Sequence, residues 1–261
     1  MQGRGIRLAA NGLLGGSYVG LRCGLARRSS GPQGRGVPAA LAPGKKAHRV
    51  QSLGDEASGG SMMTPQVVGQ EQVYNRYLTV FNRSVNYPGT GVASEGKTFE
   101  FDVVGHPRAN FHFTCIFPIR FSSGTPQVTI LREYCWGPDS ILHSLPTGGF
   151  DPKKHTSYEE CAKDELSEEA HLHGGELVRL LPNGHAGIAE SKWCANRFTP
   201  FLCIDPEPDQ APGEREAEEF IEVLQVGMEE LDDLLYSGNF SQPAFTTASL
   251  ALRHLRQTGR L

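Results

Sequence analysis

The first 54 residues of this sequence contain no Asp and no Glu. They hold nine of the 25 Lys and Arg residues, so the remaining 207 residues carry 16 basic residues against 29 acidic ones. The formal net charge of −4 therefore hides a basic head and an acidic body. An acidic body argues against a nucleic-acid groove on the folded part, because contacts with phosphates need a basic face.

The basic head also lacks a long uninterrupted apolar run. Gly and Asn break its apolar stretches, which excludes a secretory signal core and a membrane span. An acid-free segment rich in Arg, Gly, Ala and Ser is typical of organelle transit peptides. We therefore predict that residues 1–60 are a disordered leader that directs the chain to a chloroplast stroma or mitochondrial matrix rather than the cytoplasm. A disordered basic tail that binds an acidic partner is the alternative.

The cysteines show neither a C-x-x-C pair nor a spacing typical of zinc sites. They are Cys23, Cys115, Cys135, Cys161, Cys194 and Cys203. A chain of 261 residues can build one sizeable core and does not need disulfides for stability. These residues are therefore predicted to be reduced and mostly buried thiols.

The rest of the chain predicts a single α+β domain. Residues 61–74 are mostly polar and are expected to form a linker before a domain over 75–261. Runs rich in Val, Ile, Thr, Phe and Tyr, separated by turn residues, predict strands at 77–85, 98–104, 111–119, 127–134, 176–181, 193–204 and 220–226. Helices are expected at 157–172, 228–236 and 244–256. This order predicts a central mixed sheet with helices packed on its faces.

The expected helix at 157–172 carries glutamates on the side that should face the core. Ser157 and Glu160 have the spacing of a capping box, which fixes where the helix begins. At about 100° per residue, Glu165 and Glu169 fall within the core-facing stripe, and Glu168 lies one step round. Buried carboxylates without partners are costly, so three together predict a hard cation such as Mg²⁺ or Mn²⁺. A partly exposed, solvated helix face is the alternative.

A glycine turn at 145–150, Leu-Pro-Thr-Gly-Gly-Phe, comes just before this helix. The turn and the run 164–169, Asp-Glu-Leu-Ser-Glu-Glu, together resemble the Nudix box, G-x5-E-x7-R-E-U-x-E-E-x-G-U, in which U is a bulky aliphatic residue. Over roughly 75–257 the layout is most similar to ADP-ribose and ADP-sugar pyrophosphatases. The resemblance implies an α/β/α sandwich, a homodimer, and Mg²⁺-dependent hydrolysis of a nucleoside diphosphate linked to another group, which releases a nucleoside monophosphate.

The resemblance also assigns roles to individual positions. It implies that the metal ligands are Glu165, Glu168 and Glu169, and that the general base is either Glu168 or Glu190 in a later loop. Substrate-binding positions are expected at Gly148, Gly149, Arg132 and Trp136. Trp136 is expected either to stack on a base or simply to pack, and Arg132 either to contact a phosphate or to stay exposed. The alternative for Glu190 is an acid on a surface loop. His185, in the same loop, is a weaker candidate for the general base.

Four positions depart from the box and its surroundings. Thr156 stands where the first box glutamate belongs, one residue further from Gly149 than the pattern requires. Asp164 replaces the arginine, His171 replaces the second glycine, and Cys135 takes the place where many ADP-ribose hydrolases carry an arginine. A catalytically weak domain that binds a nucleotide or a protein is therefore the alternative. The substrate is left open among ADP-ribose, an ADP-sugar, a dinucleotide and a prenyl diphosphate.

Overall fold

The computed structural model describes residues 64–89, 96–121, 124–215 and 219–261. The chain divides into two units, Met1–Gly59 and Gly60–Leu261. The leader predicted over 1–60 lies outside the described residues and stays a prediction. Within the described part, no helix is long and apolar enough to cross a membrane.

A three-stranded antiparallel sheet opens the second unit. It consists of β1 (Gln66–Asn75), β2 (Thr79–Tyr87) and β3 (Lys97–Gly105), in that order. Strand β1 begins inside the segment expected to be a linker, so the linker prediction over 61–74 is wrong from Gln66 onward. Most β1 side chains are exposed, which explains the polar sequence; the pairing with β2 supplies the strand's hydrogen bonds.

The larger sheet is mixed, as predicted. Its order is β10 (Ile188–Ala189), β11 (Arg197–Ile204), β4 (His112–Arg120), β5 (Gln127–Cys135) and β13 (Ile221–Gly227). Strands β11 and β4 are parallel, and the other pairs are antiparallel. Strand β9 (Glu176–Arg179) also pairs with β11, while β8 (Leu172–His173) and β12 (Glu207–Pro208) form a separate small pair.

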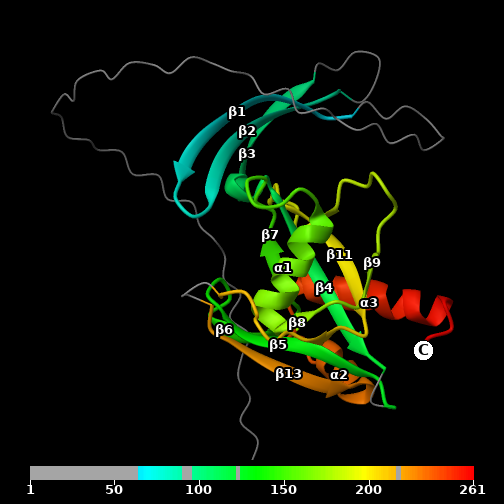
Figure 1. Ribbon diagram of the computed structural model, residues 1–261. Coiled ribbons are helices and arrows are strands. Elements are labelled where there is room, and N and C mark those ends of the chain that lie inside the picture. The colour runs from blue at the N-terminus through cyan, green and yellow to red at the C-terminus, as the bar shows by residue number, and fades with distance from the viewer. Residues whose placement is uncertain (1–63, 90–95, 122–123, 216–218) are drawn as a thin grey trace, which may run out of the picture. The chain divides into compact units, whose positions relative to one another are not determined.

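Strands β4 and β5 part soon after the turn between them. They pair only at Ile119 with Val128 and at Arg120 with Gln127. Beyond that point, β6 (Ser140–Ser144) pairs with β5 and β7 (Thr147–Gly149) pairs with β4. The glycine turn is therefore inserted between two diverging strands of the central sheet, where its backbone faces α1 (Figure 1).

Helices cover both faces of this sheet. Helix α1 (Tyr158–Ala170) packs Ala162 and Leu166 against Ile116 and Phe201. Helices α2 (Met228–Tyr236) and α3 (Gln242–Gln257) cover the other face, where the larger core lies. Neighbouring residues of β4 alternate between the two cores, because successive side chains of a strand point to opposite faces. The predicted α+β sandwich with a central mixed sheet is confirmed.

Candidate active site

The start of α1 is set by the residues that the sequence indicated. The Ser157 hydroxyl accepts a hydrogen bond from the Glu160 backbone N–H at 3.1 Å. The Glu160 carboxylate reaches back to Thr156, whose N–H donates at 2.6 Å and whose hydroxyl donates at 2.7 Å. These bonds keep the pKa of Glu160 below its usual value. Thr156, at the position of the missing box glutamate, thus completes the cap.

The end of α1 lies at the second glycine position of the Nudix box, which His171 occupies in this chain. His171 caps the helix in the left-handed conformation, with φ of 55° and ψ of 42°. A glycine adopts this conformation at no steric cost, which explains why a pattern of this kind places one there. His171 therefore ends the helix in the conformation that a glycine would adopt without strain.

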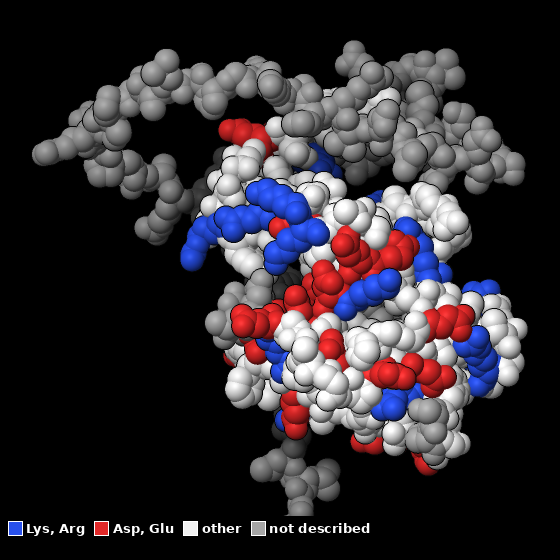
Figure 2. All heavy atoms as spheres, viewed as in Figure 1, with Lys and Arg blue, Asp and Glu red and all other residues white. Residues whose placement is uncertain are grey.

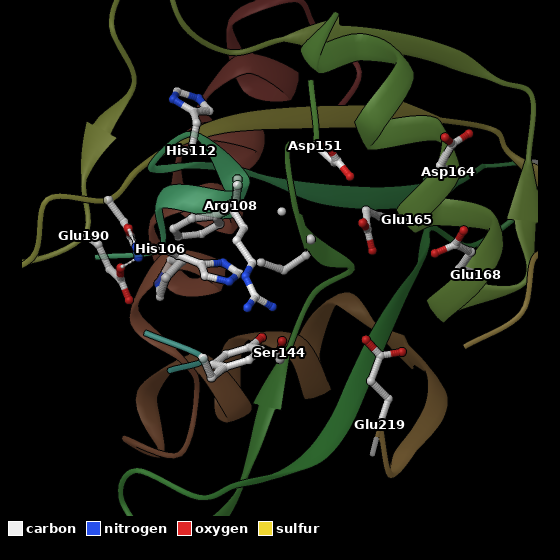
Figure 3. Close-up of a pocket in the computed structure, with 18 of the residues that line it drawn as sticks. His106, Arg108, His112, Ser144, Asp151, Asp164, Glu165, Glu168, Glu190 and Glu219 are labelled. Carbon is white, nitrogen blue, oxygen red and sulfur yellow. Dashed lines mark hydrogen bonds between the residues drawn. The ribbon is translucent and has the colours of Figure 1, made fainter. Parts of the chain in front are cut away.

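An open cavity of about 690 Å³ lies between the glycine turn, α1 and the end of the N-terminal sheet. Seven carboxylates line it, against two permanent cations (Figure 3). The acids are Glu133, Asp151, Asp164, Glu165, Glu168, Glu190 and Glu219, and the cations are Arg108 and Lys154. Figure 2 shows red acidic side chains gathered on the face of the molecule that α1 presents. The excess of carboxylates disfavours an anionic ligand unless a cation binds with it.

Glu165 lies directly against the glycine turn. A Cβ atom added at Gly148 would lie 1.8 Å from the Glu165 carboxyl carbon and one of its oxygens. Only a residue without a side chain leaves room for this carboxylate. Gly148 and Gly149 both line the cavity, Gly149 beside Ala109, and their role in binding a substrate stays a prediction.

Glu169 is the most deeply buried of the three helix glutamates, 6% exposed. One of its oxygens accepts a hydrogen bond from the Thr147 N–H at 2.7 Å. Burial and the nearby Glu165 carboxylate nevertheless raise the pKa of Glu169 well above its usual value. A cation bound beside Glu169 would offset this cost and favour the ionised carboxylate, so the environment suits a cation site.

Three helix carboxylates do not form a ready-made coordination shell. Among the described residues, no three His, Cys, Asp or Glu side chains gather closely enough to hold a metal ion together. Glu169 turns inward to Thr147, Glu165 rests on Gly148, and Glu168 packs beside Gly213. The prediction that Glu165, Glu168 and Glu169 are metal ligands therefore stays a prediction. The donor set still suits Mg²⁺, which keeps several waters and takes one or two carboxylates together with substrate phosphates.

The loop before β13 is fastened to the C-terminal half of α1. The Arg215 guanidinium donates to the backbone carbonyls of Glu168, Glu169 and Ile221. A cation at the carbonyl end of a helix is also favoured by the helix dipole. Glu219, between Arg215 and Ile221 in the chain, lines the cavity on the side of Glu165 and Glu168 (Figure 3).

The predicted base Glu190 lines the same cavity from the opposite side. Figure 3 shows it beside His106, across the cavity from Glu165 and Glu168. One of its carboxylate oxygens accepts hydrogen bonds from Cys194 at 3.1 Å and from the Asn196 amide at 3.0 Å. Glu190 therefore also holds its own loop together.

The two predicted positions on β5 and the turn after it have different outcomes. Trp136 lines the cavity and is 69% exposed, so its ring is available to a ligand. Arg132 is not among the residues that line the cavity, and its guanidinium pairs with Glu222 on β13 at 2.8 Å. Its neighbour Glu133 lines the cavity instead, because alternate residues of a strand point to opposite faces. The structure therefore places Arg132 outside the cavity that Trp136 lines.

Sequence reasoning missed the residues that other elements bring to the cavity. Arg108 comes from the 3₁₀ helix η1 (Pro107–Ala109), and Figure 3 shows its side chain reaching into the cavity. Tyr77 comes from the β1–β2 hairpin, and its ring lies 4.9 Å from the His106 ring. No local pattern marks either residue. Glu219 lies in an acidic run that the sequence does display.

The fold is shared with a hydrolase of known structure. The match to "Crystal structure of ADP compounds hydrolase" has a TM-score of 0.60 at 21% sequence identity, and covers 78% of this chain and 100% of that one. No protein-family model matches the sequence, and no curated protein matches it. At this identity the likeness concerns the fold, and it agrees with the Nudix-type sandwich expected from the sequence.

His112, at the back of the cavity, makes the stability of the fold sensitive to acid. Its ring is stacked on Tyr158 at 4.0 Å, and its Nε2 bonds the Thr199 hydroxyl at 2.8 Å. Burial, with Arg179 and Arg197 nearby, lowers the pKa of His112 to about 4. The unfolded chain binds a proton near pH 6.5 and the folded chain does not, so stability falls as the pH drops from about 6.5 to 4.

The expected loss is on the order of 2–3 kcal/mol of unfolding free energy across that window. Urea denaturation at a series of pH values measures it. The difference between the wild type and His112→Gln isolates the contribution of this ring from those of other groups. Identical pH profiles for the two proteins would contradict the assignment.

Proposed function

We propose that this chain is a Nudix-type pyrophosphohydrolase that depends on Mg²⁺, with Mn²⁺ as a substitute. Its substrate is a nucleoside diphosphate linked to another group, of the ADP-ribose or ADP-sugar type, and one product is a nucleoside monophosphate. The observation that carries the proposal is the placement of the Glu165 carboxylate against Gly148, with the buried Glu169 carboxyl held by the Thr147 N–H behind it. The fold shared with an ADP compounds hydrolase supports it.

Different residues of the cavity would bind the cation, the phosphates and the base. Glu165 and Glu168 face the cavity and would hold the cation, with Glu169 behind them. The bound ion would supply neutralisation of phosphate oxygens and a more acidic water. Arg108 and Lys154 would contact the outer phosphate oxygens, and Trp136 would stack on the base.

Hydrolysis of the pyrophosphate requires a group that accepts a proton. Water attacks one phosphorus, the bridging P–O bond breaks, and the second phosphate leaves with the bond electrons. A carboxylate of the cavity takes the proton from the attacking water. Glu168 and Glu190 are the candidates from the sequence, and Glu219 joins them because it lies on the side of the helix carboxylates.

A panel of ADP-ribose, ADP-sugars, dinucleotides and prenyl diphosphates tests the proposal. We expect a nucleoside monophosphate to be released from at least one ADP compound, only when Mg²⁺ or Mn²⁺ is present. Glu169→Gln should remove the activity. Nucleotide binding without metal-dependent turnover across the panel, even at raised pH, would sink the enzyme proposal.

That outcome would favour the second candidate, a domain that binds a nucleotide or a protein and hydrolyses little. Two observations favour this candidate: Asp164 occupies the position of the box arginine, and no three carboxylates form a ready shell among the described residues. Retained nucleotide affinity in Glu169→Gln would agree with it, because binding of that kind does not need the metal.

A further inference from the structure

His155 is a buried ring whose two nitrogens are both engaged. Its Nδ1 accepts a hydrogen bond from the Asp151 backbone N–H at 3.1 Å, and its Nε2 lies 3.3 Å from an Asp164 carboxylate oxygen. A nitrogen that accepts an N–H carries no proton of its own, so the proton of a neutral ring lies on Nε2. The ring therefore accepts from Asp151 on one side and directs its N–H-bearing nitrogen toward the Asp164 carboxylate on the other, so it connects the two.

The loop on one side of this connection is a compact turn. The Asp151 carboxylate accepts from the Lys153 N–H at 2.8 Å, and the Asp151 carbonyl accepts from Lys154 at 3.0 Å and from His155 at 2.8 Å. The Phe150 ring contacts both the His155 ring, at 5.9 Å, and the Tyr158 ring, at 4.8 Å. Residues 150–155 therefore form one hydrogen-bonded unit that continues directly from the glycine turn.

The other side of the connection is α1, one residue before the glutamate that rests on Gly148. The gap between the glycine turn and the helix decides whether the Glu165 carboxylate has room, since a single added methyl at Gly148 would overlap it. The close contact between His155 Nε2 and the Asp164 carboxylate, at 3.3 Å, spans this gap from loop to helix. It is also buried at the His155 end, where the side chain is 6% exposed, and half exposed at Asp164, at 51%.

We propose that His155 and Asp164 are positioning residues that set the distance between the glycine turn and α1, and so hold Glu165 where it can bind a cation. The inference rests on the proposed function. It gives a role to Asp164, which otherwise appears only as the loss of the box arginine. The helix supplies a hydrogen-bond acceptor at 164, and the loop supplies a donor at 155. Groups that orient metal ligands typically change metal affinity by about 10- to 100-fold when they are removed.

Two substitutions at Asp164 separate this role from a simple effect of charge. Both Asp164→Asn and Asp164→Ala remove a negative charge near Glu165. Only the asparagine keeps a carbonyl oxygen that can accept from Nε2 of His155. If the contact between His155 and Asp164 sets the gap, then Asp164→Asn binds a cation nearly as well as the wild type, and Asp164→Ala binds it at least about 10-fold more weakly.

Mn²⁺ binding by the whole chain, followed by electron paramagnetic resonance and calorimetry, is the measurement, with the Mg²⁺ concentration for half-maximal hydrolysis as a second readout. His155→Ala is expected to resemble Asp164→Ala, and the double variant to be no worse than either single one, because the two residues act through one contact. Glu159→Gln is the matched control. It removes a half-buried pairing with Arg179, at 3.6 Å, from the same helix and should leave Mn²⁺ affinity unchanged.

Equal Mn²⁺ affinities of Asp164→Asn and Asp164→Ala would overturn the inference. This holds whether both variants bind Mn²⁺ as tightly as the wild type or both bind it equally more weakly. A wild-type chain that binds no Mn²⁺ gives a different result, since it removes the proposed function and the inference with it. If His155→Ala fails to fold, as judged by circular dichroism, the two variants at the half-exposed Asp164 still decide the question.

Discussion

Replacing Gly148 by alanine should remove most of the Mg²⁺-dependent hydrolysis and leave the fold nearly unchanged. The new Cβ would lie 1.8 Å from the carboxyl carbon and one oxygen of Glu165. Because the overlapping group is the far end of a flexible side chain, the carboxylate moves and the backbone does not. We expect kcat/KM to fall by at least about 100-fold, as for the loss of a group that orients a metal site. Steady-state kinetics and thermal unfolding measure the two effects.

Gly227→Ala is the matched control for this substitution. A Cβ at Gly227 would meet no atom within 4 Å, and its backbone φ of −75° suits any residue. It should therefore change neither kinetics nor unfolding by much. Wild-type activity in Gly148→Ala would show that the position of Glu165 against the turn does not matter, and would remove the main geometric support for a cation there.

The helix that carries the site could be predicted from its sequence in some detail. The capping serine, the spacing of the apolar positions and the buried place of Glu169 all follow from the period of an α-helix and from local hydrogen bonds. The same holds for the strands of the central sheet, whose β-branched and aromatic runs are bounded by turn residues. These signals depend only on residues that are close together in the chain, so they can be recognised in a single sequence.

The cavity could be predicted only in part, because distant elements build it. The sequence around Tyr77 and Arg108 contains no signal that the β1–β2 hairpin and the 3₁₀ helix line the same cavity as α1. The choice between Arg132 and Glu133 depends on which face of β5 turns to the cavity, which the register against β13 and β6 decides. The contact between Asp164 and His155 could not be predicted from the sequence either, because it depends on how the loop before α1 folds back against the helix.

Replacing Glu169 by glutamine should have opposite effects on stability and on activity. The amide oxygen can still accept from the Thr147 N–H, while the buried charge near Glu165 disappears. Because the folded-state pKa of Glu169 is raised, wild-type stability is complete in acid and is lost as the pH rises through that pKa. The metal-free variant should therefore unfold at a higher temperature than the wild type at pH 8 and at the same temperature near pH 4.

The expected gain at pH 8 is on the order of 1–3 kcal/mol, the usual cost of a buried polar group that lacks full compensation. Added Mg²⁺ should raise the unfolding temperature of the wild type, because the ion binds only the folded chain, and should change that of Glu169→Gln much less. Glu176→Gln, which removes an exposed pairing with Arg260, at 2.8 Å, serves as the control and should show neither effect. A metal-free variant less stable than the wild type at pH 8 would mean that protein groups alone satisfy this carboxylate, and the reason for placing a cation beside it would be lost.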